Sequence, residues 1–141
     1  MISALDISTS ALVAQRIRLD TVSSNLANLT SMTRDENGEM QPYQARFVIF
    51  QTDEDLQTRQ GAIGVKVANV ETEQVEPNYR HDPNHPYAIK SGPKKGYVAY
   101  PNINMTAEMV DALVATRAYE ANLGAIELSK NMAQQSLRIL G

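Results

Sequence analysis

Proline occupies only the middle of this chain, and that distribution constrains the fold more than any other feature. All six prolines lie between Pro42 and Pro101, and seven of the eight aromatic residues lie in the same stretch. Proline breaks the interior of a helix, whereas the flanking segments 1–41 and 102–141 contain none. We therefore predict a helical arm with its following loop at 1–41, a β-rich insert at 42–101 and a second helical arm at 102–141.

The insert has the alternation of side chains that is typical of strands. Residues 43–51 and 63–67 alternate apolar with polar or small side chains, and residues 70–76 extend the second of these segments or pair with it. Residues 96–100 form a short last strand. About 60 residues make a marginal domain by themselves, so we expect the insert to lean on the arms. The predicted fold class is α+β, with the terminal helices packed as a coiled-coil-like pair in one helical domain.

Composition excludes several classes of function. The net charge of −3 argues against nucleic acid, whose binding normally requires a basic face. The absence of cysteine removes disulfides, thiol catalysis and the common structural zinc sites. The N-terminus lacks the basic region and continuous apolar run of a cleavable secretion signal, and no apolar run is long enough to span a bilayer. We expect any export to use another route.

Leucine recurs every seven residues in the first arm: Leu5, Leu12, Leu19 and Leu26. Val22 and Leu29 follow two of these leucines at the second apolar position of a heptad. This pattern predicts a helix over roughly 4–30, with Ser3 and Asp6 forming its start. The remaining positions are mostly small and weakly polar, which indicates burial among several neighbouring helices rather than a solvated back.

A stripe of apolar and small side chains runs along the second arm at helical spacing: Val110, Val114, Ala118, Ala121, Ala125, Leu128 and Met132. Other apolar residues lie outside this stripe, so the helix predicted over 104–140 is apolar more than halfway round and needs more than one partner. We expect Asn104 or Thr106 to cap it. Gly124, which is unfavourable inside a helix, indicates a close approach by another helix.

Three asparagines in the arms, Asn25, Asn28 and Asn122, have two interpretations. They are either simply exposed, or they form hydrogen bonds across helices that fix the register; we favour the second. Arg117 and Glu120 lie one turn apart, and we expect them to serve as half of a contact between subunits rather than to pair with each other.

The chain offers little material for catalysis. Its two histidines, His81 and His85, have the spacing of a metal pair on a helix, but Pro83 and Pro86 prevent a helix there. No glycine-rich phosphate loop and no serine elbow is present. We therefore expect no enzyme activity, no cofactor and no metal.

Both arms resemble bacterial flagellar axial proteins. SSNLANLTS (23–31) is similar to the N-terminal signature of rod and hook proteins. EMVDALVATRAYEANLGAIELSKNM (108–132) is similar to the C-terminal signature. Four inner segments resemble a proximal-rod member of this family: RDENGEMQPYQARFVIFQ (34–51), GVKVANV (64–70), DPNHPYA (82–88) and GYVAYPNINM (96–105). SGPKK (91–95) departs from the pattern as a small insertion.

The resemblance implies a structural subunit of the proximal rod of the flagellar basal body, in the periplasm. Such proteins leave the cell through the flagellar type III export apparatus without cleavage. They assemble helically through their terminal helices, transmit torque and line the export channel. The implied partners are copies of the chain itself and the rod proteins FlgB, FlgF, FlgG and FliE, with no nucleic acid and no small-molecule substrate.

We expect the following side chains of the two arms to lie in interfaces between subunits: Leu5, Leu12, Leu19, Val22, Asn25, Leu26, Asn28, Leu29, Met109, Val110, Leu113, Val114, Arg117, Tyr119, Glu120, Asn122, Leu123, Ile126, Leu128 and Met132.

Other functions compete with this one. The chain is alternatively another rod or hook subunit, or a soluble coiled-coil adaptor or secretion chaperone that is stable as a free dimer. An adaptor would have one apolar stripe on each helix and a charged back, which neither arm has. A metal-dependent enzyme that uses His81 and His85 is the weakest alternative.

Overall fold

The computed structural model describes residues 4–34, 38, 40–59 and 61–140. These residues form two long helices, one at each end of the chain, and six strands between them. In chain order the elements are α1 (Ala4–Ala27), β1 (Met32–Arg34), β2 (Met40–Pro42), β3 (Arg46–Gln57), β4 (Ile63–Thr72), β5 (Asn78–His81), β6 (Tyr97–Tyr100) and α2 (Met105–Leu140).

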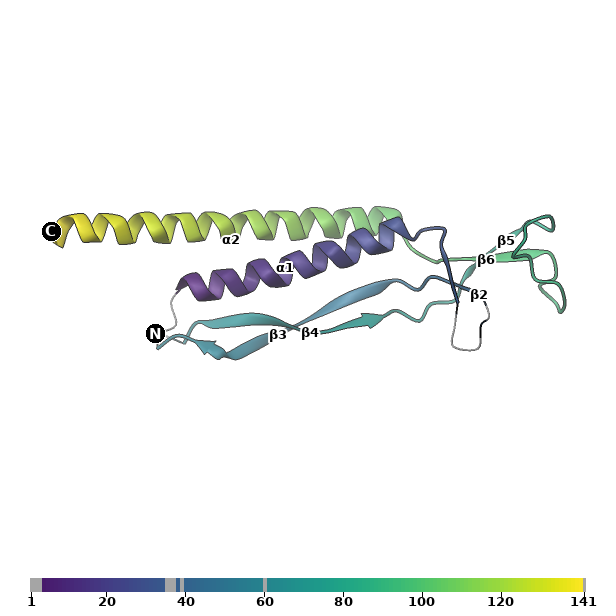
Figure 1. Ribbon diagram of the computed structural model, residues 1–141, viewed down its shortest axis with the longest axis horizontal. Coiled ribbons are helices and arrows are strands. Elements are labelled where there is room, and N and C mark those ends of the chain that lie inside the picture. The colour runs from purple at the N-terminus through teal and green to yellow at the C-terminus, as the bar shows by residue number, and fades with distance from the viewer. Residues whose placement is uncertain (1–3, 35–37, 39, 60, 141) are drawn as a thin grey trace.

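The two helices pack side by side and run in opposite directions (Figure 1). At 1.5 Å per residue, the 24 residues of α1 span about 36 Å and the 36 residues of α2 span about 54 Å. The last turns of α2 therefore extend beyond the N-terminal end of α1, as Figure 1 shows. Every side chain described over 130–139 is exposed. We call residues 130–139 the overhang.

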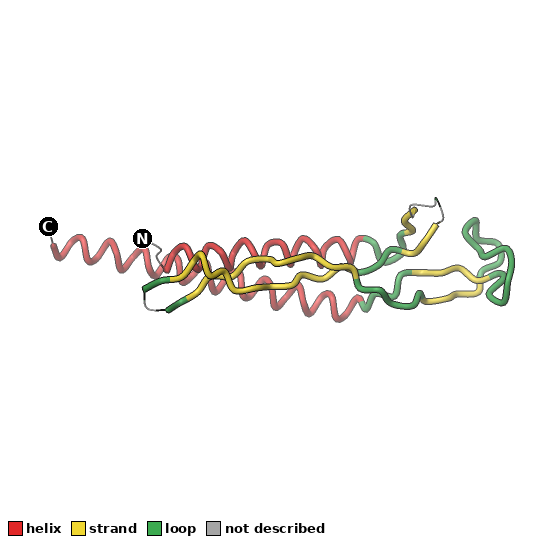
Figure 2. Tube along the Cα trace, turned by 90° about the horizontal axis from the view of Figure 1, so that it is seen from below, coloured by secondary structure: helices red, strands yellow, loops and turns green. Residues whose placement is uncertain are grey.

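The strands form three separate antiparallel pairs, β1 with β2, β3 with β4, and β5 with β6. The β3–β4 hairpin is the longest, and it runs along α1 rather than forming a compact unit (Figures 1 and 2). Val48 pairs with Val70 in the hairpin, and Thr52 pairs with Val65 after an irregularity between Ile49 and Phe50. This shift lets the hairpin twist as it follows the helix.

Close packing of the hairpin on α1 requires glycine at one position. A Cβ atom on Gly64 would lie 2.8 Å from the Leu56 Cβ and 3.1 Å from the Ser10 Oγ. The same Ser10 hydroxyl accepts a hydrogen bond from the Val65 N–H at 3.1 Å. Gly64 therefore lets the backbone of β4 approach α1 closely enough to form this bond.

The interior of the chain is small. Among the described residues, the buried hydrophobic side chains are Ala14, Val22, Ala45, Val98 and Ala115. Pro42 and Pro101 are also buried, where the strands join the helices. Beyond this junction, β5 and β6 project away from the helices and carry a long loop at the far end of the molecule from both termini (Figures 1 and 2). The chain therefore buries few of its large apolar side chains by itself.

The predicted α+β fold class is confirmed, with terminal helices and small antiparallel strand pairs between them. Asn104 caps α2 as predicted, because its Oδ1 accepts hydrogen bonds from the N–H groups of Thr106 and Ala107 at 3.0 and 3.2 Å. The predicted start of α1 involves Ser3, which lies outside the described residues.

Several boundaries differ from the prediction. α1 ends at Ala27 rather than near residue 30. Just beyond this end, the Ser24 carbonyl accepts both the Asn28 N–H at 3.1 Å and the Asn28 side-chain amide at 2.8 Å. β3 begins at Arg46 rather than at 43 and continues to Gln57. Charged residues are tolerated in its second half because that part of the hairpin is largely exposed.

Candidate assembly interface

Asn25 lies at the point where α1, the start of β3 and the start of α2 meet. Its side chain is 1% exposed. The Asn25 Nδ2 donates to the Arg46 carbonyl at 2.8 Å and to the Glu108 Oε2 at 3.0 Å. Its Oδ1 accepts from the Arg46 N–H at 2.9 Å and from the Tyr43 hydroxyl at 3.2 Å. All the donors and the acceptor of this buried amide are therefore used, and they join three elements.

A second layer of hydrogen bonds surrounds this amide. The Arg46 guanidinium donates to the Ser24 Oγ at 2.9 Å and to the Tyr43 hydroxyl at 3.3 Å. The polar junction, formed by Ser24, Asn25, Tyr43, Arg46 and Glu108, thus fixes where the hairpin and α2 leave the end of α1. Buried networks of this kind specify geometry because any other arrangement would leave polar groups without partners.

The three asparagines singled out from the sequence behave differently. Asn25 bonds across to α2 through Glu108, as the register hypothesis requires. Asn28 and Asn122 make no such bond to any residue that the structure describes. Their amides instead donate to carbonyls four residues earlier in the sequence, those of Ser24 and Ala118.

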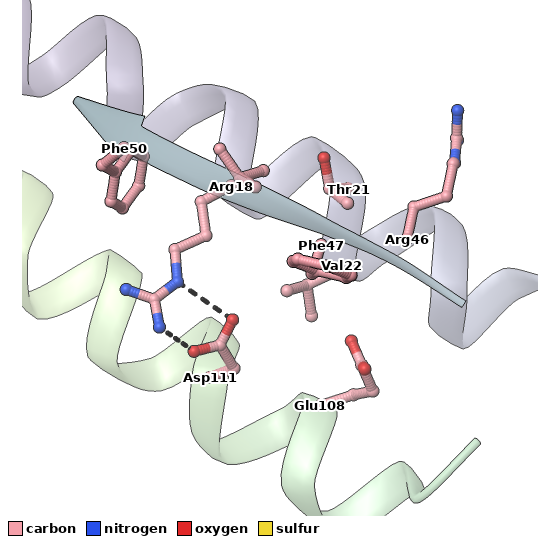
Figure 3. A pocket seen from close by; sticks show the side chains of 9 residues that line it. Arg18, Thr21, Val22, Arg46, Phe47, Phe50, Glu108 and Asp111 are labelled. Carbon is pink, nitrogen blue, oxygen red and sulfur yellow. Dashed lines mark hydrogen bonds and ion pairs between the residues drawn. The ribbon is translucent and has the colours of Figure 1, made fainter. Parts of the chain in front are cut away.

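A groove opens beside the polar junction, between α1, β3 and the first turns of α2. It has a volume of about 350 Å³, and its lining includes Arg18, Phe47, Phe50 and Asp111. Figure 3 shows Arg18 reaching from α1 to Asp111 on α2. The Arg18 Nε donates to Asp111 Oδ2 at 3.0 Å, and its Nη2 donates to Oδ1. The guanidinium also lies 5.9 Å from the centre of the Phe50 ring.

This two-point ion pair closes one wall of the groove and locks the helices in register, because a guanidinium and a carboxylate align both bonds in one plane. The sequence analysis did not identify it. Arg18 is one of few charged residues in α1, and this rarity indicates that it has a specific partner. That partner, Asp111, lies 93 residues away in the sequence. No periodic pattern connects two positions so far apart.

The two faces of α2 have opposite character. The face toward α1 consists of half-buried or buried positions and includes Asp111, Ala115 (0% exposed), Asn122 and Ile126. The opposite face carries large apolar side chains, and four of them are 49–58% exposed: Met109, Val110, Leu113 and Val114. We call these four residues the outward patch. The predicted stripe that begins at Val110 and Val114 therefore points away from α1, and small and polar residues make the contact instead.

The other predicted interface residues of α2 divide in the same way. Tyr119, Asn122 and Ile126 are half-buried. The remaining members are exposed: Arg117, Glu120, Leu123, Leu128 and Met132. Arg117 and Glu120 form no ion pair with any residue that the structure describes. A Cβ atom on Gly124 would meet nothing within 4 Å, so the close helix approach predicted there is not made within this chain.

The predicted leucine seam of α1 does not form the centre of the helix pair. Leu5 is 38% exposed, and five others are half-buried: Leu12, Leu19, Leu26, Asn28 and Leu29. Val22 and Asn25 alone of the predicted set are buried, together with Ala14 and Thr21. The seam is displaced because α1 is shared between two partners, α2 and the β3–β4 hairpin.

The two histidines lie on the loop side of β5 and point to different tyrosines. The His81 ring centre is 5.0 Å from that of Tyr97, edge on, and the His85 ring centre is 5.6 Å from that of Tyr87. His85 Nδ1 accepts a hydrogen bond from the Tyr87 N–H at 3.2 Å. Over the described residues, no three His, Cys, Asp or Glu side chains gather in a group that would hold a metal ion.

Neither α1 nor α2, over the part of the chain that the structure describes, is both long and apolar enough to cross a membrane.

Comparison with known proteins points to one family. A family model described as "Flagella basal body rod protein" matches residues 5–29, and one described as "Flagellar basal body rod FlgEFG protein C-terminal" matches residues 94–139. The two matches cover all of α1 except Ala4 and all of α2 except Leu140, and they include the outward patch.

Full-length relatives agree with these matches. The chain is 36% identical to the flagellar basal-body rod protein FlgC of Borreliella burgdorferi over 151 residues, which cover 99% of this chain and 97% of that protein. It is 37% identical to FlgC of Bacillus subtilis (96% and 95% covered) and 37% identical to FlgC of Salmonella typhimurium (99% and 97% covered). The chain therefore belongs to the FlgC family of flagellar basal-body rod proteins.

Proposed function

We propose that this chain, a structural subunit of the flagellar basal-body rod, assembles through the surfaces that α1 and α2 leave uncovered. The observation that carries the proposal is the outward patch of α2. Met109, Val110, Leu113 and Val114 follow one another at helical spacing, and about half of each side chain is exposed. An apolar stripe of this kind is costly to leave in water, and helices that carry one are normally covered by a partner.

The other residues predicted for subunit contacts fit the same arrangement. Arg117 and Glu120 are exposed charges without partners in the described chain, beside the outward patch on the same helix. Leu128 continues the apolar surface to the overhang, which includes Met132. Asn25 supports the interface indirectly, because its hydrogen bonds hold α1, β3 and α2 in a fixed relation, and Val22 is buried one turn before it on α1.

The finer part of the proposal concerns place and partners. The segments 1–41 and 102–141 form one axial helical domain that lines the export channel, and the insert 42–101 packs outside it. The subunit reaches the periplasm through the flagellar type III export apparatus. There it joins copies of itself and the rod proteins FlgB, FlgF, FlgG and FliE into a helical proximal rod that transmits torque. Its role is structural and involves no catalysis.

The adaptor and chaperone alternatives are disfavoured by the same surface. A free dimer of two-helix chains would cover the single apolar stripe of each helix and leave charged backs in water. In this chain, α1 is occupied by both α2 and the hairpin, and α2 still has an apolar face without a partner.

A single substitution tests the proposed role of the outward patch. Leu113→Asp places a charge at the centre of the patch but outside the interior of the chain. We expect the circular dichroism spectrum and the melting temperature of the purified protein to remain those of the unchanged chain. In a flagellated host whose own copy has been deleted, we expect the variant to build no complete rod in electron micrographs and to restore no swimming.

Two control variants make this result specific. Leu113→Met keeps an apolar side chain of similar volume and is expected to restore swimming. Gln74→Asp adds the same charge to an exposed segment outside the helices and is also expected to restore it. Normal rods from Leu113→Asp would show that the outward patch takes no part in assembly.

A further inference from the structure

The loop between β5 and β6 is an ordered, positively charged surface that the proposed role of the helices does not use. We call residues 82–96 the basic loop; it contains Lys90, Lys94 and Lys95 against the single carboxylate of Asp82. Backbone hydrogen bonds close it at both ends. The Asp82 N–H donates to the Gly96 carbonyl at 3.0 Å, and the Gly96 N–H donates to the Ile89 carbonyl at 2.9 Å.

The sharp turn in this loop carries the segment SGPKK, the insertion noted in the sequence. Gly92 and Gly96 adopt φ angles of 92° and 82°, which favour glycine. The Lys95 N–H donates to the Gly92 carbonyl at 3.2 Å across the turn. The lysines are therefore displayed from a defined backbone rather than from a structureless segment.

Aromatic side chains accompany the lysines. The Lys94 ammonium lies 3.5 Å from the centre of the Tyr79 ring and 3.4 Å from a Glu76 carboxylate oxygen. The Tyr79 side chain, followed by Glu76, raises the pKa of Lys94 above its usual value. Lys90 and Lys95 form no ion pair with any described residue, and together with His85 they line a hollow of about 260 Å³. Exposed tyrosines are enriched at protein interfaces.

A surface of opposite charge lies on the hairpin. We call residues 53–55 of β3 the acidic strand end, because they are Asp53, Glu54 and Asp55 in succession. Asp53 is paired with Lys66 at 3.3 Å. Glu54 and Asp55 are exposed and have no ion-pair partner among the described residues.

The two charged surfaces cannot meet within one chain. The hairpin turn that follows the acidic strand end lies near the N-terminus, and the basic loop lies at the opposite end of the molecule (Figure 1). The stretch of β3 from Arg46 to Asp55 alone, nine steps along the strand at about 3.3 Å each, separates them by roughly 30 Å.

We propose that the basic loop of one copy docks on the acidic strand end of a second copy of this chain. Lys90 and Lys95 face Glu54 and Asp55 in this contact, with the exposed tyrosines beside them. The two surfaces differ, so the contact is heterologous, and it repeats along an open helical array unless its rotation closes a ring. The inference rests on the proposed function and adds to it a contact between copies that lies outside the helices.

A zero-length carbodiimide cross-linker tests this contact directly, because it couples an amine to a carboxylate only where the two touch. It is applied to isolated basal bodies that contain the chain, and the coupled peptides are identified by mass spectrometry. We expect Lys90 or Lys95 to be coupled to Glu54 or Asp55, a product that must join two copies. Basal bodies that contain the chain, but whose loop lysines couple only to other proteins or to nothing, would overturn the proposal. Absence of the chain from basal bodies would instead contradict the proposed function.

Charge reversal supplies the second arm of the test. Lys90→Glu with Lys95→Glu removes the two reacting amines and places like charges in contact, so coupling between the basic loop and Glu54 or Asp55 is expected to be lost. Adding Glu54→Lys and Asp55→Lys to the same chain restores opposite charges, and coupling is expected to return with the amine and carboxylate exchanged. Arg34→Glu, an exposed charge reversal in β1, serves as the control and should leave coupling unchanged. If the variant with all four substitutions does not recover coupling, the proposed contact between the basic loop and the acidic strand end is wrong.

Discussion

At the scale of single residues, the geometry of this chain depends on one amide more than on any apolar side chain. Asn25 holds the end of α1 to β3 and α2 through four hydrogen bonds, and it is almost completely buried. Asn25→Ala would leave the Arg46 backbone and the Glu108 carboxylate without these partners. Since unpaired buried polar groups are costly, we expect the free energy of unfolding to fall by about 3 kcal/mol, measured by urea titration.

Asn28 provides a matched comparison for this prediction. It is the same residue type, directly after the end of α1, and among the described residues its side-chain amide donates only to the nearby Ser24 carbonyl. Asn28→Ala should therefore cost about 1 kcal/mol or less. Equal losses for the two variants would mean that the polar junction contributes nothing beyond an ordinary helical asparagine.

At this scale the sequence identified a structurally important residue only where its type was unusual for its position in a helix. Asn25 was such a residue, because an asparagine inside an apolar heptad pattern calls for a hydrogen-bonding partner. Its partners Tyr43 and Arg46 were not, since they belong to a connecting segment whose path no periodicity describes. For the same reason the pair between Arg18 and Asp111 was missed.

At the scale of elements, the helices followed from the sequence and their orientation did not. Absence of proline and helical spacing located α1 and α2 within a few residues. β1, β2 and β5 were missed because their sequences, MTR, MQP and NYRH, show no alternation of apolar with polar side chains. β6 is equally short but contains the apolar run YVAY, and it was predicted. The apolar stripe of α2 was recognised, but a sequence does not reveal which of several apolar faces meets the nearest helix. Here the face that contains the small, fully buried side chain of Ala115 packs on α1, since a small side chain lets the two helices approach closely.

Gly124 separates the stability of α2 from its role in assembly. Apart from its chain neighbours and the nearby backbone of α2, no described residue lies within 4 Å of a Cβ atom at this position. Gly124→Ala should therefore raise the free energy of unfolding by about 0.5–1 kcal/mol through the helix backbone. If a neighbouring subunit approaches here as the sequence predicts, the same variant should build fewer rods. Thermal unfolding and counts of rods in electron micrographs measure the two effects. A stabilised variant with normal rods would exclude a close approach at Gly124.

At the scale of the whole molecule, the chain is a thin, layered body whose ends differ. The sequence predicted an insert that leans on the arms, and the hairpin does lie along α1. It did not reveal that the insert divides into a hairpin running back along the helices and a basic loop pointing away from them. The contrast in charge between these parts is hidden by the modest net charge of −3.

The overhang makes a prediction for the free subunit. α2 contacts α1 over its first part, whereas the side chains of residues 130–139 are all exposed. We expect backbone amides within 109–126 to exchange with deuterium at least about tenfold more slowly than those of the overhang, since local opening there breaks few contacts. Uniform protection along α2, measured by residue-resolved hydrogen exchange on the dilute protein, would contradict this division.

The unequal length of the two helices has a mechanical consequence for any array built from such subunits. α2 is about 18 Å longer than α1. In such an array, the ends of the α2 helices would therefore lie at a different level from the ends of α1 and the hairpin. The junctions between successive copies would then be staggered between the two layers. We expect a twist applied at one level of such an array to cross continuous helix rather than a joint, which stiffens the array under torsion.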